Sequence, residues 1–175
     1  THALWGACRD LFQIYVGYAA STGQLAQAVQ ERTRTLPAGT WISGGPWRYE
    51  MRGDLGQSPR AWLDALAPDH PVALSDTSRH SVWCNSRALA LVGYDETTTP
   101  PAGGVIGRGA DGALTGFLAE AALSPVRKCT RETPEQLREA CDYAVCYLNS
   151  LGYTGFKEPM ADEAILQAYA AACDA

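Results

Sequence analysis

The sequence predicts an α/β fold in which a mixed α+β segment interrupts an alternation of helices and strands. Helical spacing over 133–150 is followed by Gly152, a short apolar run at 153–157 and a second helical pattern, which is typical of parallel sheets and barrels. The stretch 41–130 has frequent glycine and proline and only short apolar runs, which indicate brief helices and strands. We therefore expect three segments, with the middle one as a mixed subdomain inserted between the others: 1–40, 41–130 and 131–175.

The first predicted element is a helix at 22–36. Ser21 and Gln24 have the spacing of a capping box, in which each side chain bonds the other residue's backbone N–H. Apolar residues then recur near one helical face until Pro37, which cannot continue the helix.

A short strand-like run at 40–42 follows this helix. The next three residues, Gly44-Gly45-Pro46, predict a turn, because glycine and proline together disfavour regular structure. We expect this turn to deliver Trp47 and Arg48 to a surface or a cleft.

Short capped helices are predicted in the middle segment. Ser58 is a good N-cap for a helix at 59–66, because Pro59 suits the first helical position. A strand is expected at 71–74, and Asn85 then caps a second helix at 86–91.

The remaining elements are a hairpin, a helix, a strand and a last helix. Asp111-Gly112 lies between Val105-Ile106 and Leu114-Thr115 and predicts a two-residue hairpin turn. Thr133 and Gln136 fit a capping box that starts a helix. A buried strand is then expected at 153–157, followed by helix from 161 onward.

Composition excludes several classes of protein. The net charge is −5, from 19 acidic and 14 basic residues without a basic run, so nucleic acid is a poor candidate partner. No stretch approaches the roughly 18 apolar residues of a membrane span, and residues 1–20 do not resemble a signal peptide. The six cysteines form no Cys-x-x-Cys pair, which favours reduced thiols. We expect a cytoplasmic chain with no membrane or nucleic-acid partner.

Both ends of the sequence look cut. It starts at Thr1 with no polar lead-in, and it stops inside an alanine-rich helical pattern at 161–175. We expect a fragment of a longer protein.

Only three histidines are available for metal or acid–base chemistry: His2, His70 and His80. His2 is either a solvated terminal residue or a functional one, and His70 lies in a loop where we expect it to be structural or exposed. His80 follows a predicted strand and precedes Trp83 and Asn85. These three residues either form part of a site, or His80 holds a turn while Asn85 merely caps its helix.

Lys157 and Glu158 end the predicted strand at 153–157. In βα units this is the edge at which chemistry is usually placed. Glu158 could equally favour the start of the last helix through its negative charge. The sequence contains no G-x-S-x-G, phosphate-loop or H-E-x-x-H motif, so serine hydrolases, nucleotide binders and zincins lack their signatures here.

The order of several short motifs resembles the amidohydrolase family 3 enzymes of the metal-dependent amidohydrolase superfamily. Thr1-His2-Ala3-Leu4 resembles the end of the family's Asp-x-His-x-His strand, with His2 as the second histidine. Other segments similar to the family's motifs are, in order, 40–47, 59–72, His80-Ser81-Val82-Trp83-Cys84-Asn85-Ser86, 103–120 and 151–156.

The resemblance implies a TIM-type (β/α)8 barrel of which this chain holds the first βα units, with the insert at 41–130 lining a substrate cleft. It implies that His2 is a ligand of one or two divalent metal ions, usually zinc, which would activate water to attack an amide-type carbonyl. Side chains expected at the cleft are Trp47, Arg48, His80, Trp83 and Asn85, with Lys157 and Glu158 as weaker candidates.

The resemblance also implies that the catalytic site is incomplete, because the family's bridging lysine, two further histidines and an aspartate would lie beyond residue 175. We expect a fragment of a hydrolase acting on non-peptide C–N bonds of amide or formamide substrates, inactive by itself and able to self-associate through exposed barrel edges. The alternative is a non-catalytic module that binds small molecules or other proteins.

Overall fold

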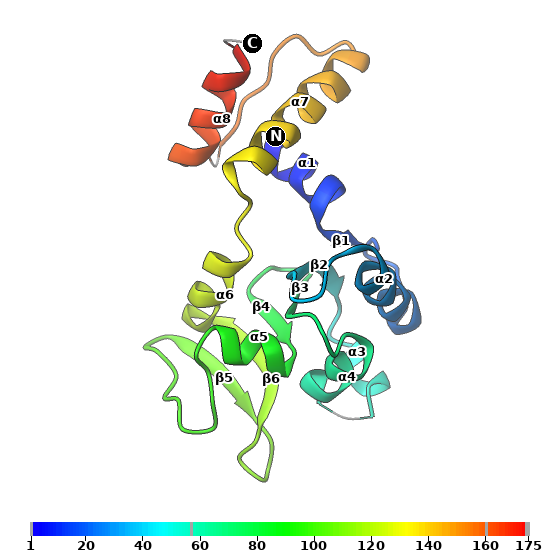
Figure 1. Cartoon of the computed structure of the whole chain (residues 1–175), viewed down its shortest axis with the longest axis vertical. Helices are drawn as coiled ribbons and strands as arrows, with labels where there is room; N and C mark the ends of the chain where they lie inside the picture. Colours follow the sequence, from blue (N-terminus) through cyan, green and yellow to red (C-terminus); the bar gives the residue numbers. More distant parts are fainter. Residues whose placement is uncertain (1, 57, 160, 174–175) are drawn as a thin grey trace. The chain divides into compact units, whose positions relative to one another are not determined.

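The computed structural model describes residues 2–56, 58–159 and 161–173. They fall into two compact units (Figure 1). The helical unit comprises residues 1–13 and 131–175, and the sheet unit comprises residues 14–130. Within the described ranges, no helix combines the length and apolar character that a membrane crossing requires.

The helical unit contains α1 (Ala3–Phe12), α7 (Pro134–Ser150) and α8 (Glu163–Cys173). Helix α7 packs against both α1 and α8. Thr133 and Gln136 form the predicted capping box at the start of α7. The buried core of the unit consists of Leu4, Ala7, Cys8, Leu137, Ala140, Cys141, Ala144 and Ala168.

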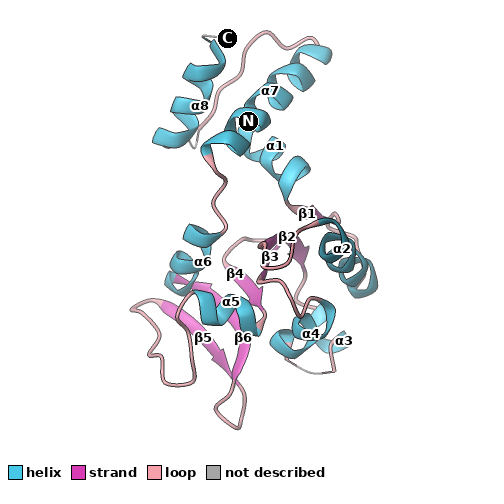
Figure 2. Ribbon diagram, viewed as in Figure 1, coloured by secondary structure: helices cyan, strands magenta, loops and turns pink. Residues whose placement is uncertain are grey.

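Two strand predictions fail in the helical unit. Residues 153–157 form an exposed loop, because no strand of the described part of the chain lies beside them to accept their backbone hydrogen bonds (Figure 2). At the other end, Thr1 lies outside the described residues, and His2 is the N-cap of α1 rather than the end of a strand. The helical spacing of Leu4, Ala7 and Cys8, which are all buried, favours α1.

The sheet unit is built on six strands in the order β1-β2-β3-β4-β6-β5. The first three are parallel, and the others pair antiparallel. The predicted α/β class is confirmed, but this sheet is mixed and open rather than barrel-shaped. The strands are β1 (Ile14–Tyr15), β2 (Ile42–Trp47), β3 (Val72–Asp76), β4 (Ser81–Cys84), β5 (Gly104–Arg108) and β6 (Leu114–Glu120).

Short helices connect these strands, and several of their caps were predicted. Ser21 and Gln24 form the capping box of α2, and Ser58 and Asn85 cap α4 and α5 through their side chains. The helical segments are α2 (Thr22–Thr35), α3 (Met51–Asp54), α4 (Pro59–Leu66), α5 (Ser86–Leu91), the 3₁₀ turn η1 (Ala121–Leu123) and α6 (Ser124–Cys129).

The predicted hairpin forms, but its turn is longer than expected. Strands β5 and β6 pair antiparallel, with Arg108 opposite Leu114. Five residues therefore connect them, and the bond from Gly112 N–H to Gly109 O closes the loop. The prediction of a two-residue turn at Asp111-Gly112 was wrong, because the connection also includes the residues from Gly109 to Ala113.

The predicted turn at Gly44-Gly45-Pro46 is in fact part of strand β2. Gly44 and Gly45 have φ values of 133° and 138°, and neighbouring strands pass close on both sides. A Cβ atom on Gly44 would lie 2.1 Å from the carbonyl oxygen of Ile14, and one on Gly45 would lie 2.4 Å from that of Ser75. The two glycines thus let β1 and β3 approach β2, which places Trp47 in the core.

An aromatic cluster fills the centre of the sheet unit. The Trp47 and Trp83 rings stack with centroids 4.3 Å apart, and Trp62 meets Trp83 edge to face. The Trp47 indole N–H donates to the carbonyl oxygen of Leu74 at 2.8 Å. These contacts anchor both tryptophans between β2, β3 and β4.

Candidate functional site

His2, Glu158 and Tyr169 meet in the helical unit. The His2 Nδ1 atom lies 3.3 Å from Glu158 Oε1, and the Tyr169 hydroxyl donates to Glu158 Oε2 over 3.4 Å. The Glu158 side chain is only 9% exposed, whereas that of His2 is 42% exposed. Burial, and then the charge of Glu158, raise the pKa of Tyr169 to about 12, so this phenol stays protonated and donates its hydrogen bond.

Sequence reasoning named His2 and Glu158 separately but missed Tyr169. Tyr169 lies inside the helix expected from 161 onward, where the sequence gives no sign that the phenol hydroxyl has a partner. The exposed loop at 153–157 carries Glu158 back to His2 without forming the expected strand. The neighbouring residue Lys157 is exposed.

These residues do not make a metal site by themselves. Metal sites in hydrolases use three or more protein ligands. In the part of the chain that the structure describes, no three His, Cys, Asp or Glu side chains gather closely enough to hold a metal ion. His2 and Glu158 supply at most two donors, so the donor set does not fit a complete metal centre.

His80 and Glu120 form a second polar pair, in the sheet unit. The His80 Nδ1 atom lies 3.1 Å and 3.2 Å from the two carboxylate oxygens of Glu120, so the ring donates its Nδ1–H and leaves Nε2 toward solvent. Both side chains are more than half exposed. A backbone bond from Glu120 N–H to His80 O ties the two residues together.

Strained backbone flanks this pair. Arg79 and Glu120 are the non-glycine residues with positive φ in the described ranges, at 63° and 54°. Such conformations cost about 1–3 kcal/mol each and gather at functional positions. This observation supports His80 as a functional residue and adds Glu120, which the sequence placed only in a motif.

We expect Glu120→Gly to be more stable than Glu120→Ala by about 1 kcal/mol, because glycine alone adopts this conformation without strain. Both variants lose the His80 partner equally, so the comparison isolates the backbone. Urea unfolding of the two variants measures the difference. Equal stabilities would show that Glu120 is unstrained in solution.

Asn85 lies wholly inside the sheet unit. Its Oδ1 accepts from the backbone N–H groups of Val72 and Ala88, and its Nδ2 donates to the carbonyl oxygens of Ala67 and His70. All four hydrogen-bonding positions of the amide are therefore used. In this structure the Asn85 amide joins α4, β3 and α5, and a place for Asn85 in the wall of a substrate cleft stays a prediction.

The predicted cleft tryptophans are buried as well. Trp83 is fully buried and Trp47 is 3% exposed, and they contact each other rather than a cavity. Trp83 Nε1 has no hydrogen-bond partner. Arg48 is half-buried and donates to the carbonyl oxygen of Ala20, which fixes it to the start of α2. Of the five cleft residues predicted in the sheet unit, His80 is exposed, and substrate contact by any of them stays a prediction.

Burial also prevents the Cys84 thiol from acting as a nucleophile. Loss of hydration raises the pKa of this fully buried thiol to about 12, so it remains protonated. Burial raises the pKa of Cys8 to about 12 in the same way.

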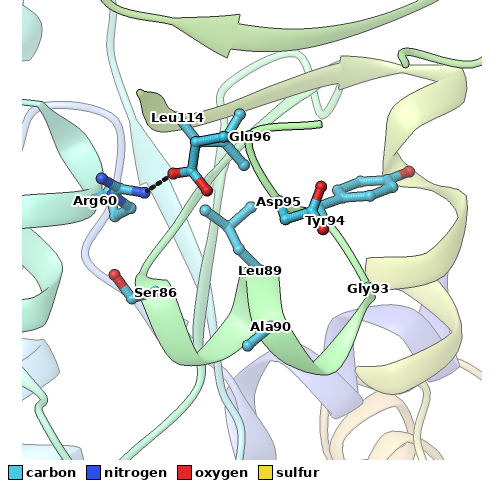
Figure 3. A pocket seen from close by; sticks show the side chains of 9 residues that line it. All are labelled: Arg60, Ser86, Leu89, Ala90, Gly93, Tyr94, Asp95, Glu96 and Leu114. Carbon is cyan, nitrogen blue, oxygen red and sulfur yellow. Dashed lines mark hydrogen bonds and ion pairs between the residues drawn. The ribbon is translucent and has the colours of Figure 1, made fainter. Parts of the chain in front are cut away.

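A pocket of about 430 Å³ lies elsewhere in the sheet unit, between α4, α5 and the start of β6 (Figure 3). None of the predicted site residues lines it. Its walls carry one basic and two acidic side chains, Arg60, Asp95 and Glu96. Sequence reasoning missed it because the polar residues come from separate elements.

Comparison with known proteins decides the family. The model of the amidohydrolase family matches residues 1–174, nearly the whole sequence. The chain belongs to the amidohydrolase family. This confirms the family that the ordered motifs predicted.

Individual members show how much of a longer protein this amidohydrolase chain represents. The Bacillus subtilis (strain 168) protein YtcJ, named as an amidohydrolase, is 32% identical over 144 residues, which are 82% of this chain and 27% of YtcJ. The N-substituted formamide deformylase of Arthrobacter pascens is 34% identical over 105 residues, or 60% of this chain and 19% of the enzyme. The chain thus spans about a quarter or less of these relatives.

A solved structure shares the fold of the amidohydrolase chain. The crystal structure of an uncharacterized metal-dependent hydrolase from Pyrococcus furiosus matches with a TM-score of 0.63 at 22% identity. The match covers 97% of this chain and 32% of the Pyrococcus chain.

Proposed function

We propose that this chain is part of a metal-dependent hydrolase that cleaves C–N bonds other than peptide bonds, in amide or formamide substrates. Its membership in the amidohydrolase family supports hydrolysis. The formamide deformylase among its relatives supports the bond type, and the Pyrococcus hydrolase supports a metal. We propose that this hydrolysis takes place in the cytoplasm, on a small-molecule substrate, and that the protein has neither nucleic acid nor a membrane as a partner.

The contact between His2 and Glu158 carries the proposal. In metal sites, a ligating histidine usually bonds a carboxylate through one ring nitrogen, which orients the other nitrogen toward the metal. His2 has this arrangement, with Nδ1 near Glu158 and Nε2 opposite. We propose His2 as one ligand of a divalent metal, zinc by preference, whose other ligands lie outside this sequence.

The isolated chain should be inactive, because it supplies at most two of the required donors. We propose that the helical unit belongs to the start of a TIM-type barrel whose remaining elements would cover it. Large apolar side chains that are at least 40% exposed support this proposal and should promote self-association: Trp5, Tyr143, Tyr147, Leu151, Tyr153, Phe156 and Leu166.

Zinc titration of the 175-residue chain, followed by calorimetry, tests the role of His2. We expect weak binding, with a dissociation constant on the order of 0.1 mM or higher, and a loss of about tenfold in His2→Ala. His80→Ala serves as the control, because it removes an imidazole that is also paired with a carboxylate and is even more exposed, at 68% against 42%, from the other unit. Equal zinc binding by wild type and His2→Ala would count against His2 as a ligand.

Formate release from N-benzylformamide, with and without added zinc, tests the second part of the proposal. We expect no release above background from the chain alone. Release that depends on the chain and disappears in His2→Ala would show that its site is complete after all.

A non-catalytic module is the second candidate, and the pocket in the sheet unit favours it. Such a module should be compact and monomeric. Sedimentation distinguishes the two, since exposed apolar side chains on the helical unit predict dimers or larger species for a hydrolase segment.

A further inference from the structure

The strongest unassigned feature is the pocket of about 430 Å³ in the sheet unit. Its volume falls within the range of about 300–1,000 Å³ that is usual for small-molecule sites. It shares no residue with the His2 or His80 pairs, so what it binds is independent of whether the chain takes part in hydrolysis.

The pocket has an apolar base and a charged margin. Leu89, Ala90 and Leu114 provide the apolar surface, and Leu89 and Leu114 are almost fully buried. Figure 3 shows Arg60 on one side of these residues, with Glu96 reaching toward it. The Arg60 Nη1 atom donates to Glu96 Oε1 at 3.1 Å.

Hydrogen bonds hold the wall that carries the acidic residues. Arg108 donates to the backbone carbonyl oxygens of Glu96, Thr98 and Gly112 at 2.9–3.0 Å, which ties this loop to the β5–β6 connection. The Tyr94 hydroxyl donates to Ala122 O at 3.1 Å. The pocket is therefore formed in advance, and a ligand need not order it.

Both acidic groups keep their charge well below neutral pH. Hydrogen bonds from the Thr97 and Thr98 side chains lower the pKa of Asp95. The backbone N–H of Glu96 itself, and then Arg60, lower the pKa of Glu96. The margin thus presents two negative charges and one positive charge on an apolar base.

We propose that this pocket binds a small zwitterion with an aliphatic body, of the kind represented by a free α-amino acid. Its carboxylate pairs with the Arg60 guanidinium, which suits planar carboxylates, and its ammonium group pairs with Glu96 and Asp95. Its aliphatic chain lies over the exposed Ala90 and the small exposed edges of Leu89 and Leu114. The zwitterion replaces the exposed Arg60–Glu96 ion pair by two ion pairs, one to Arg60 and one to the acidic side chains. A ligand with a single charge can form only one of these two pairs.

NMR titration of the 175-residue chain with three probes of one carbon skeleton tests the proposal: norvaline, pentylamine and pentanoate. We expect norvaline to shift the amide signals of Leu89, Gly93 and Leu114 with a dissociation constant on the order of 1 mM. Pentylamine and pentanoate each lose one ion pair and should bind about threefold to fivefold more weakly.

Two variants test which pocket side chain pairs with which charged group of the ligand. Arg60→Gln and Glu96→Gln should each weaken norvaline binding about threefold to fivefold, whereas the same changes on the exposed face of α7, Arg138→Gln and Glu139→Gln, should not. Arg60→Gln should leave pentylamine binding intact, and Glu96→Gln should leave pentanoate binding intact. The proposal is overturned by norvaline shifts that are absent or map elsewhere, by a singly charged probe that binds as tightly, or by pocket variants that behave as the controls.

Discussion

Asn85→Ala should destabilise the sheet unit by about 4 kcal/mol. The change removes the N-cap of α5 and leaves the backbone N–H of Val72 and the carbonyl oxygen of His70 without their partner, whereas Ala67 O keeps its bond from the His70 N–H. Each unsatisfied buried group costs about 1–3 kcal/mol, and loss of a cap costs about 1 kcal/mol. Urea unfolding followed by tryptophan fluorescence measures the change, since Trp47 and Trp83 lie in this unit.

Asn149→Ala is the matched control. Asn149 lies exposed near the end of α7, so its change should stay within about 0.5 kcal/mol. A loss below about 1 kcal/mol in Asn85→Ala would mean that water or a shifted backbone replaces the amide.

Gly44→Ala should destabilise the sheet unit by at least about 3 kcal/mol. The new methyl group would overlap the backbone of Ile14, 2.1 Å from its carbonyl oxygen, and the φ of 133° is unfavourable for any L side chain. The expected consequence is loss of the β1–β2 pairing and an earlier unfolding midpoint in urea.

Gly53→Ala provides the comparison. Gly53 lies in the short helix α3, and no atom lies within 4 Å of the position that its Cβ would take. Alanine there should be neutral or stabilising by up to about 1 kcal/mol. If Gly44→Ala unfolds at the same urea concentration as Gly53→Ala, then strand β1 is not held against β2 in solution.

Elements with local signals were predictable from the sequence. Helices α2, α4, α5 and α7 begin where Ser21, Ser58, Asn85 and Thr133 indicated, because an N-cap acts within one turn of its helix. Strands depend on partners that lie far away in the sequence. The run at 153–157 has strand-like residues but no partner, whereas Ser81–Cys84 pairs with β3 and β6 and is buried throughout.

The candidate site was predictable only in part, for a similar reason. His2 and Glu158 stood out by residue type, but their contact joins positions 156 residues apart. Trp83 and Asn85 also stood out by type, and the structure uses them in the core. A buried amide with four partners and a cleft amide cannot be told apart by sequence, because the partners are backbone groups.

The composition of the helical unit has a consequence for the order in which the chain folds. The sheet unit is continuous from 14 to 130, so it can complete its core while synthesis is still in progress. Helix α1 must wait for α7, more than 120 residues later, before Leu4, Ala7 and Cys8 are covered. During that interval α1 is a short apolar helix without a partner, the kind of segment that chaperones bind on the ribosome.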